Sequence, residues 1–197
     1  MEPLAYRMRP NSIDDIVGQN HLVGKGGVIR KMLENGHLPS LILYGNPGIG
    51  KTTIAHAISS HLQLPSFTFN ASTDNKASLK DIIQSAEANP ETLVIVDEIH
   101  RMKKDIQDYL LPFVEKGRIT LIGITTINPY HSVNPAIRSR CLVLKLDTLN
   151  TDDLSLLLDR TLNFLNLEFT SEARTYLVQM ANGEARSLIN MVEAIRF

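Results

Sequence analysis

The stretch that most constrains the fold of this chain is Leu41–Thr53, LILYGNPGIGKTT. Its apolar start has the length of a buried parallel strand, and the following Thr52–Leu62 places apolar residues at helical spacing. Three glycines between strand and helix allow successive backbone N–H groups to point at a phosphate chain, and the helix N-terminus adds partial positive charge. The stretch therefore predicts a phosphate-binding loop between a strand and a helix.

The loop matches the pattern G-x-x-x-x-G-K-[ST]. In this pattern the Lys51 side chain reaches the β- and γ-phosphates, and the Thr52 hydroxyl binds Mg²⁺. The predicted nucleotide-binding residues of the loop are Gly45, Asn46, Pro47, Gly48, Ile49, Gly50, Lys51, Thr52 and Thr53. The pattern predicts that the chain binds a nucleotide with Mg²⁺.

Composition excludes several other classes of protein. Lysine and arginine number 20 against 21 acidic residues, so the chain lacks the overall basic excess of many nucleic-acid-binding proteins, and any DNA contact must be local. The single cysteine, Cys141, excludes an internal disulfide and fits a reducing compartment. No apolar stretch approaches the roughly 20 residues of a membrane span, and the first ten residues lack the apolar core of a signal peptide. We expect a cytoplasmic protein without membrane contact.

The rest of the chain predicts an α/β fold followed by helices. Five apolar runs alternate with helical patterns, which predicts a five-stranded parallel sheet with helices on both faces. After the first run, the others are Ser66–Phe69, Leu93–Val96, Ile119–Ile124 and Leu142–Leu146. Strand signals stop after Asp147. We therefore expect a nucleotide-binding α/β domain over residues 1–147 and a small all-helical lid domain over residues 148–197.

Three helices are expected in the second domain. Thr151 is the expected cap of the first, with acidic residues in its first turn. The second runs from about Ser171 to Ala181 and ends at an Asn-Gly pair. The third begins near Glu184 and has one apolar face, formed by Leu188, Met191, Val192 and Ile195.

Two acidic residues end the third strand, in LVIVDEIH. At the carboxyl end of a strand, Asp97 can face Mg²⁺ and its waters, while Glu98 can reach a water in line with the γ-phosphate. An ordinary solvated strand end is the alternative. Because the pair follows a phosphate loop, we interpret it as a Walker B motif with Glu98 as the general base.

Other polar side chains complete the predicted site. The fourth strand ends near Thr126, whose hydroxyl can bond the attacking water; Asn128 is a weaker candidate because a turn accounts for it equally well. Arg138 and Arg140 precede the fifth strand, where they are either surface charges or a source of γ-phosphate stabilisation. Arg186 lies in the first turn of a helix, where its charge opposes the helix dipole, and this suggests another role.

In this order of motifs, the whole chain resembles the AAA+ ATPases and, among them, the clamp-loader group. More narrowly it is similar to the replication-associated recombination ATPases of the RarA/MgsA type, which include the Werner-helicase-interacting ATPase of eukaryotes. The most specific segments are PLAYRMRPNSIDDIVGQNHLVG, VDEIHRMKKDIQDYLLPFVEKG, IGITTINPYHSVNPAIRSR and GEARSLIN.

The resemblance implies a role for each matching residue. It implies that Lys51 and Thr52 form Walker A, Asp97 and Glu98 Walker B, and Thr126 sensor 1. It further implies that Asn70 is a switch that holds the catalytic glutamate away from water, that Arg140 is an arginine finger, and that Arg186 is sensor 2. The wall of the adenine site is implied to consist of Arg9, Pro10, Ile16, Val17 and Gly18.

The family's activity is ATP hydrolysis stimulated by DNA. The resemblance therefore implies ATP and Mg²⁺ as cofactors, and forks, ends or gaps in DNA as partners at stalled replication forks during recombination and repair. It further implies partnership with single-strand-binding protein and a homotetramer formed by a helical domain beyond Phe197. We therefore expect this chain to be an ATPase core, with its arginine finger acting on a neighbouring subunit.

Two departures from the family pattern occur after the second helix of the lid. Glu184 stands where Asp is usual, and Ser187 replaces a second basic residue, which puts a phosphate or interdomain contact in doubt. Two other functions stay open: a true clamp-loader subunit, and a structural subunit that binds ATP without hydrolysing it. The absence of a cysteine cluster argues against a zinc-bearing clamp loader, and the retained Lys51 and Glu98 argue against the structural subunit.

DNA contacts are the least constrained part of the site. Arg101, Lys103 and Lys104 form a basic cluster after Walker B, on the helix that in clamp loaders lies toward the central channel. A solvated helix start explains the cluster equally well. If these residues contact phosphates, they carry no sequence preference.

Overall fold

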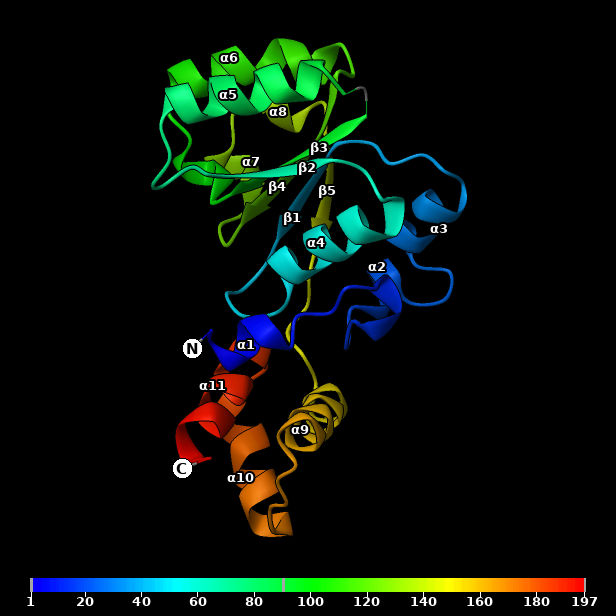
Figure 1. Ribbon diagram of the computed structural model, residues 1–197, viewed down its shortest axis with the longest axis vertical. Helices are drawn as coiled ribbons and strands as arrows, with labels where there is room; N and C mark the ends of the chain where they lie inside the picture. The colour runs from blue at the N-terminus through cyan, green and yellow to red at the C-terminus, as the bar shows by residue number, and fades with distance from the viewer. Residues whose placement is uncertain (1, 90, 197) are drawn as a thin grey trace.

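The computed structural model describes residues 2–89 and 91–196, and Met1, Pro90 and Phe197 lie outside these ranges. One five-stranded sheet forms the larger part (Figure 1). Its strands are β1 (Leu41–Tyr44), β2 (Ser66–Asn70), β3 (Thr92–Asp97), β4 (Ile119–Thr125) and β5 (Leu142–Lys145). They are all parallel, in the order β2-β3-β4-β1-β5. The predicted five-stranded parallel sheet is confirmed.

Helices cover both faces of the sheet, as predicted (Figure 1). One face carries α2 (Asn20–Val23), α3 (Val28–Glu34) and α4 (Lys51–Leu62); the other carries α5 (Lys76–Glu87), α6 (Lys104–Glu115), α7 (Pro129–Ser132) and α8 (Pro135–Arg138). Successive residues of a strand serve opposite cores: Leu41 and Leu43 pack in the α4 core, whereas Ile42 packs in the α5 and α6 core. This is why the inner strands β1, β3 and β4 are largely apolar, whereas the edge strand β2, SFTFN, alternates polar and apolar residues.

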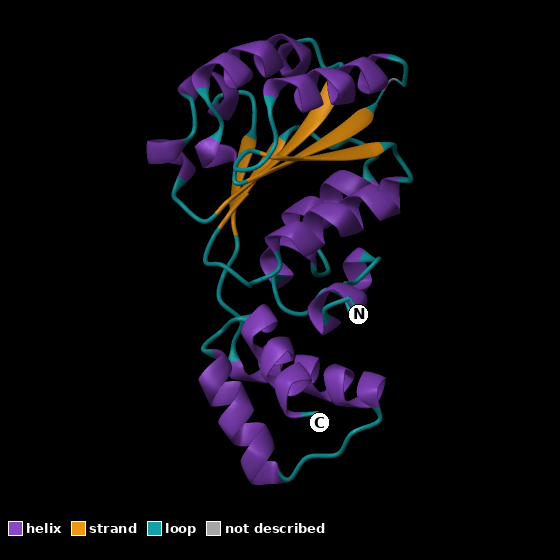
Figure 2. Ribbon diagram, turned by 60° about the vertical axis from the view of Figure 1, so that its left-hand side comes forward, coloured by secondary structure: helices purple, strands orange, loops and turns teal. Residues whose placement is uncertain are grey.

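Three helices after β5 form a separate apolar cluster. They are α9 (Thr151–Leu165), α10 (Ser171–Ala181) and α11 (Ala185–Ile195), and the cluster includes Leu154, Leu158, Leu177, Leu188 and Val192. Figure 2 shows this helical part joined to the sheet part by loops. The small all-helical part is confirmed as an element of the fold.

Two details of these helices differ from the sequence prediction. Thr151 is the first residue of α9, and Asn150 is its cap: Asn150 and Asp153 form a reciprocal capping box. An Asn at the cap position provides the acceptor that Thr151 was expected to supply. Ile195 is 52% exposed, because the apolar face of α11 is covered only as far as Val192. Asn182 ends α10 in the left-handed conformation, as the Asn-Gly signal predicts.

The N-terminal segment bridges the two parts. It contains α1 (Leu4–Arg7), a short 3₁₀ turn η1 (Ile13–Asp15) and α2; a second such turn, η2 (Ile99–Arg101), follows β3. The buried Leu4 donates its backbone N–H to the Glu193 carboxylate of α11, at 3.0 and 3.1 Å from the two oxygens. Figure 1 shows α1 between the start of α4 and α11. The segment thus contacts the helical part close to the phosphate loop.

Candidate functional site

The phosphate loop joins β1 to α4 and surrounds the side chain of Lys51. This lysine is 6% exposed, and its Nζ donates hydrogen bonds to the carbonyl oxygens of Gly45 at 2.8 Å and Asn46 at 2.5 Å. Burial lowers the pKa of Lys51 to about 8; the Asp97 carboxylate opposes this shift, and the Arg186 charge adds to it. The ammonium group is therefore held by neutral carbonyls, which are weaker acceptors than a phosphate group.

Asp97 and Glu98 lie where β3 ends. The backbone of Glu98 has φ 52° and ψ 43°, a left-handed conformation that is uncommon for a residue with a side chain. Asp97 Oδ1 accepts a hydrogen bond from the Glu98 backbone N–H at 2.9 Å. This turn gives the two carboxylates different environments: Asp97 acts on Lys51, and Glu98 contacts the segment after β2.

Two side chains hold the Glu98 carboxylate. The Ser72 hydroxyl donates a hydrogen bond to Glu98 Oε2, and Arg101 Nε lies 3.3 Å from the same oxygen. Asn70, the predicted switch residue, accepts a hydrogen bond from the backbone N–H of Ser72 at 2.9 Å. Asn70 therefore orders the turn that presents Ser72 to Glu98. Sequence reasoning missed Ser72; the available signal is its place two residues after β2, the strand that pairs with β3.

The end of β4 supplies two threonines. Thr125 is almost fully buried, and its Oγ1 hydrogen-bonds His100 Nδ1 at 2.8 Å and accepts from the Ile127 backbone N–H at 3.0 Å. Burial lowers the pKa of His100, while the Glu98 carboxylate opposes the shift. Thr125 thus joins β4 to the turn after β3, and the exposed Thr126 follows it. Asn128 caps α7 through the Tyr130 backbone N–H at 3.0 Å, in agreement with the turn interpretation.

The helical part contributes Arg186 to the phosphate loop. The backbone N–H of Arg186 donates to the Gly48 carbonyl at 3.2 Å. Gly48 has φ +72°, and a Cβ at this position would lie 3.3 Å from Glu184 Cβ, so the loop and α11 approach closely here. Ser187 donates its hydroxyl to Glu184 Oε2 at 2.8 Å. The two positions that depart from the family pattern therefore bond to each other.

The N-terminal segment provides Arg9. Its guanidinium stacks over the Tyr6 ring at 5.1 Å. The pKa of His56 on α4 is lowered mainly by burial and secondarily by the Arg9 charge, so Arg9 lies near α4.

These elements enclose one cleft of about 530 Å³. Its lining brings together most of the predicted catalytic residues with the centre of the phosphate loop. The lining residues among those predicted are Arg9, Pro47, Gly48, Gly50, Lys51, Thr52, Thr53, Asn70, Asp97, Glu98, Thr126 and Arg186. Lining residues that were not predicted as site residues include Pro3, Tyr6, Thr125, Ile189 and Asn190.

Several predicted residues lie outside this lining. Gly45, Asn46 and Ile49 belong to the loop but do not line the cleft; the Gly45 and Asn46 carbonyls instead face Lys51. Of the predicted adenine wall, Pro10, Ile16, Val17 and Gly18 are also absent from the lining. Ile16 packs beside the α4 core, and Gly18 contacts the start of α9.

Arg140 lies away from the cleft of its own chain. It precedes β5, which is parallel to β1, so it lies near the amino-terminal ends of the strands. The phosphate loop follows the carboxyl end of β1, on the opposite side of the sheet. Its guanidinium forms an ion pair with Glu115 at the end of α6 and donates to the Ala136 carbonyl at 2.7 Å. Arg138 stacks over the Tyr130 ring at 4.9 Å and donates to the carbonyl of the same residue at 3.0 Å. Arg138 therefore holds α7 against α8.

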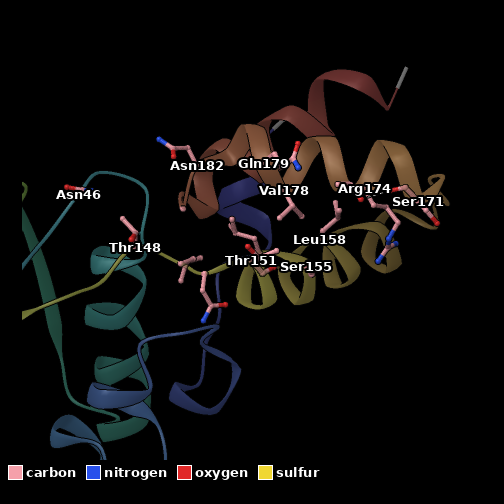
Figure 3. A pocket seen from close by; sticks show the side chains of 15 residues that line it. Asn46, Thr148, Thr151, Ser155, Leu158, Ser171, Arg174, Val178, Gln179 and Asn182 are labelled. Atoms are coloured by element: carbon pink, nitrogen blue, oxygen red, sulfur yellow. Dashed lines mark hydrogen bonds between the residues drawn. The ribbon is translucent and has the colours of Figure 1, made fainter.

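A second hollow of about 850 Å³ lies in the helical part (Figure 3). Hydroxyl and amide groups of α9 and α10 line it together with residues 148–150 and 182–183. Figure 3 shows Thr151, Ser155 and Leu158 on one side and Val178 and Gln179 on the other, with Asn182 toward the phosphate loop. The hollow thus borders the connection between β5 and α9.

The first cleft fits a magnesium nucleotide by its donor chemistry. Backbone N–H groups at the start of α4, the Lys51 ammonium and the Arg186 guanidinium suit a phosphate chain. Thr52 and Asp97 offer a hydroxyl and one carboxylate. Mg²⁺ in such sites is bound by one or two carboxylates together with phosphates and water. Among residues 2–89 and 91–196, no group of three His, Cys, Asp or Glu side chains is arranged to hold a metal ion unaided.

Comparison with protein families gives one match over the sheet part. Residues 41–146 match the model of the ATPase family associated with various cellular activities (AAA). No helix in the described ranges has both the length and the apolar character needed to cross a membrane.

Similar proteins extend the comparison to nearly the whole chain. Replication-associated recombination protein A is 42% identical in Bacillus subtilis and 36% in Escherichia coli K12, in both over 98% of this chain and over 48% and 45% of the relative. ATPase WRNIP1 of Dictyostelium discoideum is 36% identical over 97% of this chain and 23% of its own length. The chain thus spans about half the length of the bacterial relatives.

Solved structures of similar fold include the Thermotoga maritima RuvB Holliday junction branch migration motor. That structure superposes with a TM-score of 0.83 at 26% identity, and the match covers 95% of this chain and 65% of RuvB.

Proposed function

The chain belongs to the AAA family of ATPases, in the group of the replication-associated recombination proteins, and from this premise we propose that it hydrolyses ATP in response to DNA. The family prediction made from the motifs is confirmed. The single observation that supports hydrolysis most is the meeting of Lys51, Glu98 and Arg186 around one cleft, although they come from three distant parts of the sequence.

Each residue has a distinct task in the proposed reaction. The phosphate loop and Lys51 bind the phosphate chain, and Arg186 neutralises charge that develops on the γ-phosphate. Glu98 accepts a proton from the water that attacks the γ-phosphorus while the bond to the bridging β-phosphate oxygen breaks and ADP leaves, and Thr126 orients that water. Bound Mg²⁺, held by Thr52 and, through water, by Asp97, would supply further charge neutralisation on the phosphates.

We propose that the adenine base of the nucleotide binds next to Arg9, Pro10, Ile16, Val17 and Gly18. Arg9 already lines the cleft, and the other four follow it in the segment that bridges α4 and the helical part. Backbone N–H and C=O groups of this segment can match the edge of adenine without a special side chain.

The proposed assembly places Arg140 on a neighbour's nucleotide. We propose a division at residues 147 and 148 between the nucleotide-binding and lid domains, and a tetramer in the full-length protein. Partnership with single-strand-binding protein, which the family resemblance implies, and a cytoplasmic location, which is expected from the composition, are also part of this proposal.

DNA is proposed to bind at the basic cluster after β3. Lys103 and Lys104 are exposed at the start of α6, and Lys76 at the start of α5 lies 3.6 Å from Asp105 of α6. Arg101 belongs to the same cluster and also pairs with Glu98. DNA phosphates bound there would compete with the Glu98 carboxylate for Arg101. DNA binding would therefore free Glu98, the general base, from its ion pair.

The proposal predicts phosphate release from ATP that increases with forked DNA. The measurement compares release with no DNA, with forked DNA and with a duplex of equal length, at several salt concentrations. Replacing Lys103 and Lys104 with Ala should weaken DNA binding and reduce the salt slope by about two units, one for each lost phosphate contact. ATP binding without release, with or without DNA, would instead favour the structural subunit, and stimulation that requires a sliding clamp would favour a clamp-loader subunit.

A second prediction concerns the restraint on Glu98. Replacing Ser72 with Ala should raise release in the absence of DNA severalfold, because the Glu98 carboxylate loses its hydroxyl donor and moves more freely. Ser85→Ala is the matched control, since the Ser85 hydroxyl bonds only the preceding turn of α5 at the Asp81 carbonyl. Unchanged basal release in Ser72→Ala, together with full DNA stimulation, would show that Ser72 does not restrain the base.

A further inference from the structure

We propose that Gln19 is a positioning residue that fixes the connection between the sheet and the lid. Through this contact, a nucleotide whose adenine is bound by the segment of residues 9–18 sets the position of Arg186. This inference rests on the proposed nucleotide function of the cleft. Gln19 lies next to the expected adenine wall but is absent from the cleft lining, and none of the roles described above uses it.

The Gln19 side chain pairs with the backbone of a single residue. Its Nε2 donates to the Asp147 carbonyl at 2.7 Å, and its Oε1 accepts from the Asp147 backbone N–H at 3.0 Å. Both ends of the amide are thus used on Asp147, the second residue after β5, and this fixes the orientation as well as the position of that backbone. Gln19 is only 6% exposed, so water competes little for these bonds.

The backbone around Gln19 is adapted to this contact. Gln19 has φ 54°, a left-handed conformation that costs free energy for a residue with a side chain and persists only where its surroundings hold it. Gly18 has φ +71°, and a Cβ there would lie 2.6 Å from Leu149 Cδ2 and 3.0 Å from Asp153 Oδ2. Gly18 and Gln19 therefore contact the connection at residue 147, at residue 149 and at the first turn of α9.

The contacts continue from this connection to the phosphate loop. The Leu149 backbone N–H donates to the Gly183 carbonyl at 3.0 Å, and Gly183 directly precedes the cap of α11. Arg186, in the first turn of α11, donates its backbone N–H to Gly48 at 3.2 Å. A continuous path of contacts thus leads from the proposed adenine-binding segment, residues 9–18, through Gln19, residues 147–149 and residue 183 to Arg186.

The connection contacts both the lid and the N-terminal segment, and on the lid side Leu149 is buried in the apolar cluster of α9, α10 and α11. Residues 148–150 also border the second hollow, and Figure 3 shows Thr148 and Thr151 among its lining side chains. On the side of the N-terminal segment, His21 Nε2 lies 2.9 Å from the Lys145 carbonyl, and Arg160 donates to the Asp15 carbonyl at 2.6 Å, but both bonds are exposed. Of these three contacts of the N-terminal segment, the Gln19 pair is made by a buried side chain, so it is the one best placed to fix the orientation of the connection.

The test measures lid orientation and catalysis in the same chain. Spin labels are attached to Glu34→Cys on α3 and Glu172→Cys on α10, two exposed positions, and the distribution of label distances is recorded with and without ADP. Cys141 is replaced with Ala in every labelled chain, so that labels attach only at the two introduced cysteines. Fluorescent ADP affinity, single-turnover hydrolysis and the thermal unfolding midpoint are measured in parallel.

Gln19→Leu should broaden the distance distribution with ADP bound and lower the single-turnover rate about 10- to 100-fold, because a misplaced Arg186 loses its geometry. ADP affinity should change less than about threefold, since the phosphate loop is intact. Gln19→Glu keeps an acceptor for the Asp147 N–H but places a carboxylate oxygen against the Asp147 carbonyl, so it should broaden the distribution as well. The matched control is Gln63→Leu, an exposed glutamine with the same left-handed backbone (φ 53°) at the end of α4.

Three results would overturn the proposal. The first is a Gln19→Leu chain whose distances and rate equal those of Gln63→Leu. The second is a parallel loss of rate, affinity and unfolding midpoint in both Gln19 variants, which would make the residue structural only. The third is a wild-type chain that neither binds ADP nor changes its label distances, which would overturn the proposed nucleotide function as well.

Discussion

Replacing Glu98 with Gln is expected to leave ATP affinity near wild type and to lower turnover by about 10²- to 10⁴-fold, the usual contribution of a general base. Glutamine retains the size and polarity of the side chain, but it cannot accept the proton of the attacking water. Binding should persist because the phosphate loop, Lys51 and Arg186 are untouched. Fluorescent ATP titration and single-turnover hydrolysis measure the two effects separately.

Lys51→Ala provides the contrasting variant. The Lys51 ammonium lies inside the loop on the Gly45 and Asn46 carbonyls, within reach of a bound phosphate chain. Its removal should therefore weaken nucleotide binding itself. If Glu98→Gln and Lys51→Ala lose nucleotide to the same extent, the proposed division of labour between loop and base is wrong.

Turnover is also expected to depend on a second subunit, through Arg140. An arginine finger contributes about 10³- to 10⁵-fold to the rate of phosphoryl transfer. Arg140 lies at the end of the sheet opposite to its own phosphate loop and pairs there with Glu115, so the proposed finger would have to act on a neighbour's nucleotide. A monomeric chain should bind ATP and Mg²⁺ but hydrolyse slowly.

The decisive experiment mixes two inactive variants of the full-length protein. Neither Arg140→Ala nor Glu98→Gln should turn over ATP alone, whereas mixed oligomers should recover part of the activity, because an intact base meets an intact finger across some interfaces. Arg118→Ala is a suitable control, since Arg118 pairs with Glu87 at 2.9 Å as an exposed surface charge. Wild-type turnover by Arg140→Ala alone, with no gain on mixing, would make Arg140 a surface charge.

The helices and strands follow closely from local patterns in the sequence. The apolar run before the phosphate loop predicted β1, and the later runs predicted β2 to β5 within about one residue. The inner strands β1, β3 and β4 gave the clearest signal, because parallel strands buried on both faces are largely apolar. Local rules placed the last helices equally well but mistook the cap of α9. Thr151 and Asn150 can both cap a helix, and the choice depends on which side chain reaches the Asp153 N–H.

The sequence predicted which residues belong to the candidate site, but it did not predict which of their side chains contact one another. Motifs identified Lys51, Asp97, Glu98, Thr126 and Arg186, and the structure places all five around one cleft. Motifs could not identify Ser72 as the partner of Glu98, because this bond joins residues 26 positions apart, in the turns that follow two neighbouring strands. The same holds for Gln19 and Asp147, which are 128 positions apart.

The sequence by itself therefore determined the kind of fold, the order of its elements and the chemistry of the phosphate loop. These depend on apolar periodicity, glycine conformation and charge, which act over a few neighbouring residues. Only the tertiary structure decided that Ser72 and Arg101 hold the Glu98 carboxylate, that Arg140 pairs with Glu115 away from its own cleft, and that Gln19 holds the connection to the lid. Those contacts depend on the order of strands in the sheet and on the docking of the lid, which bring distant residues together.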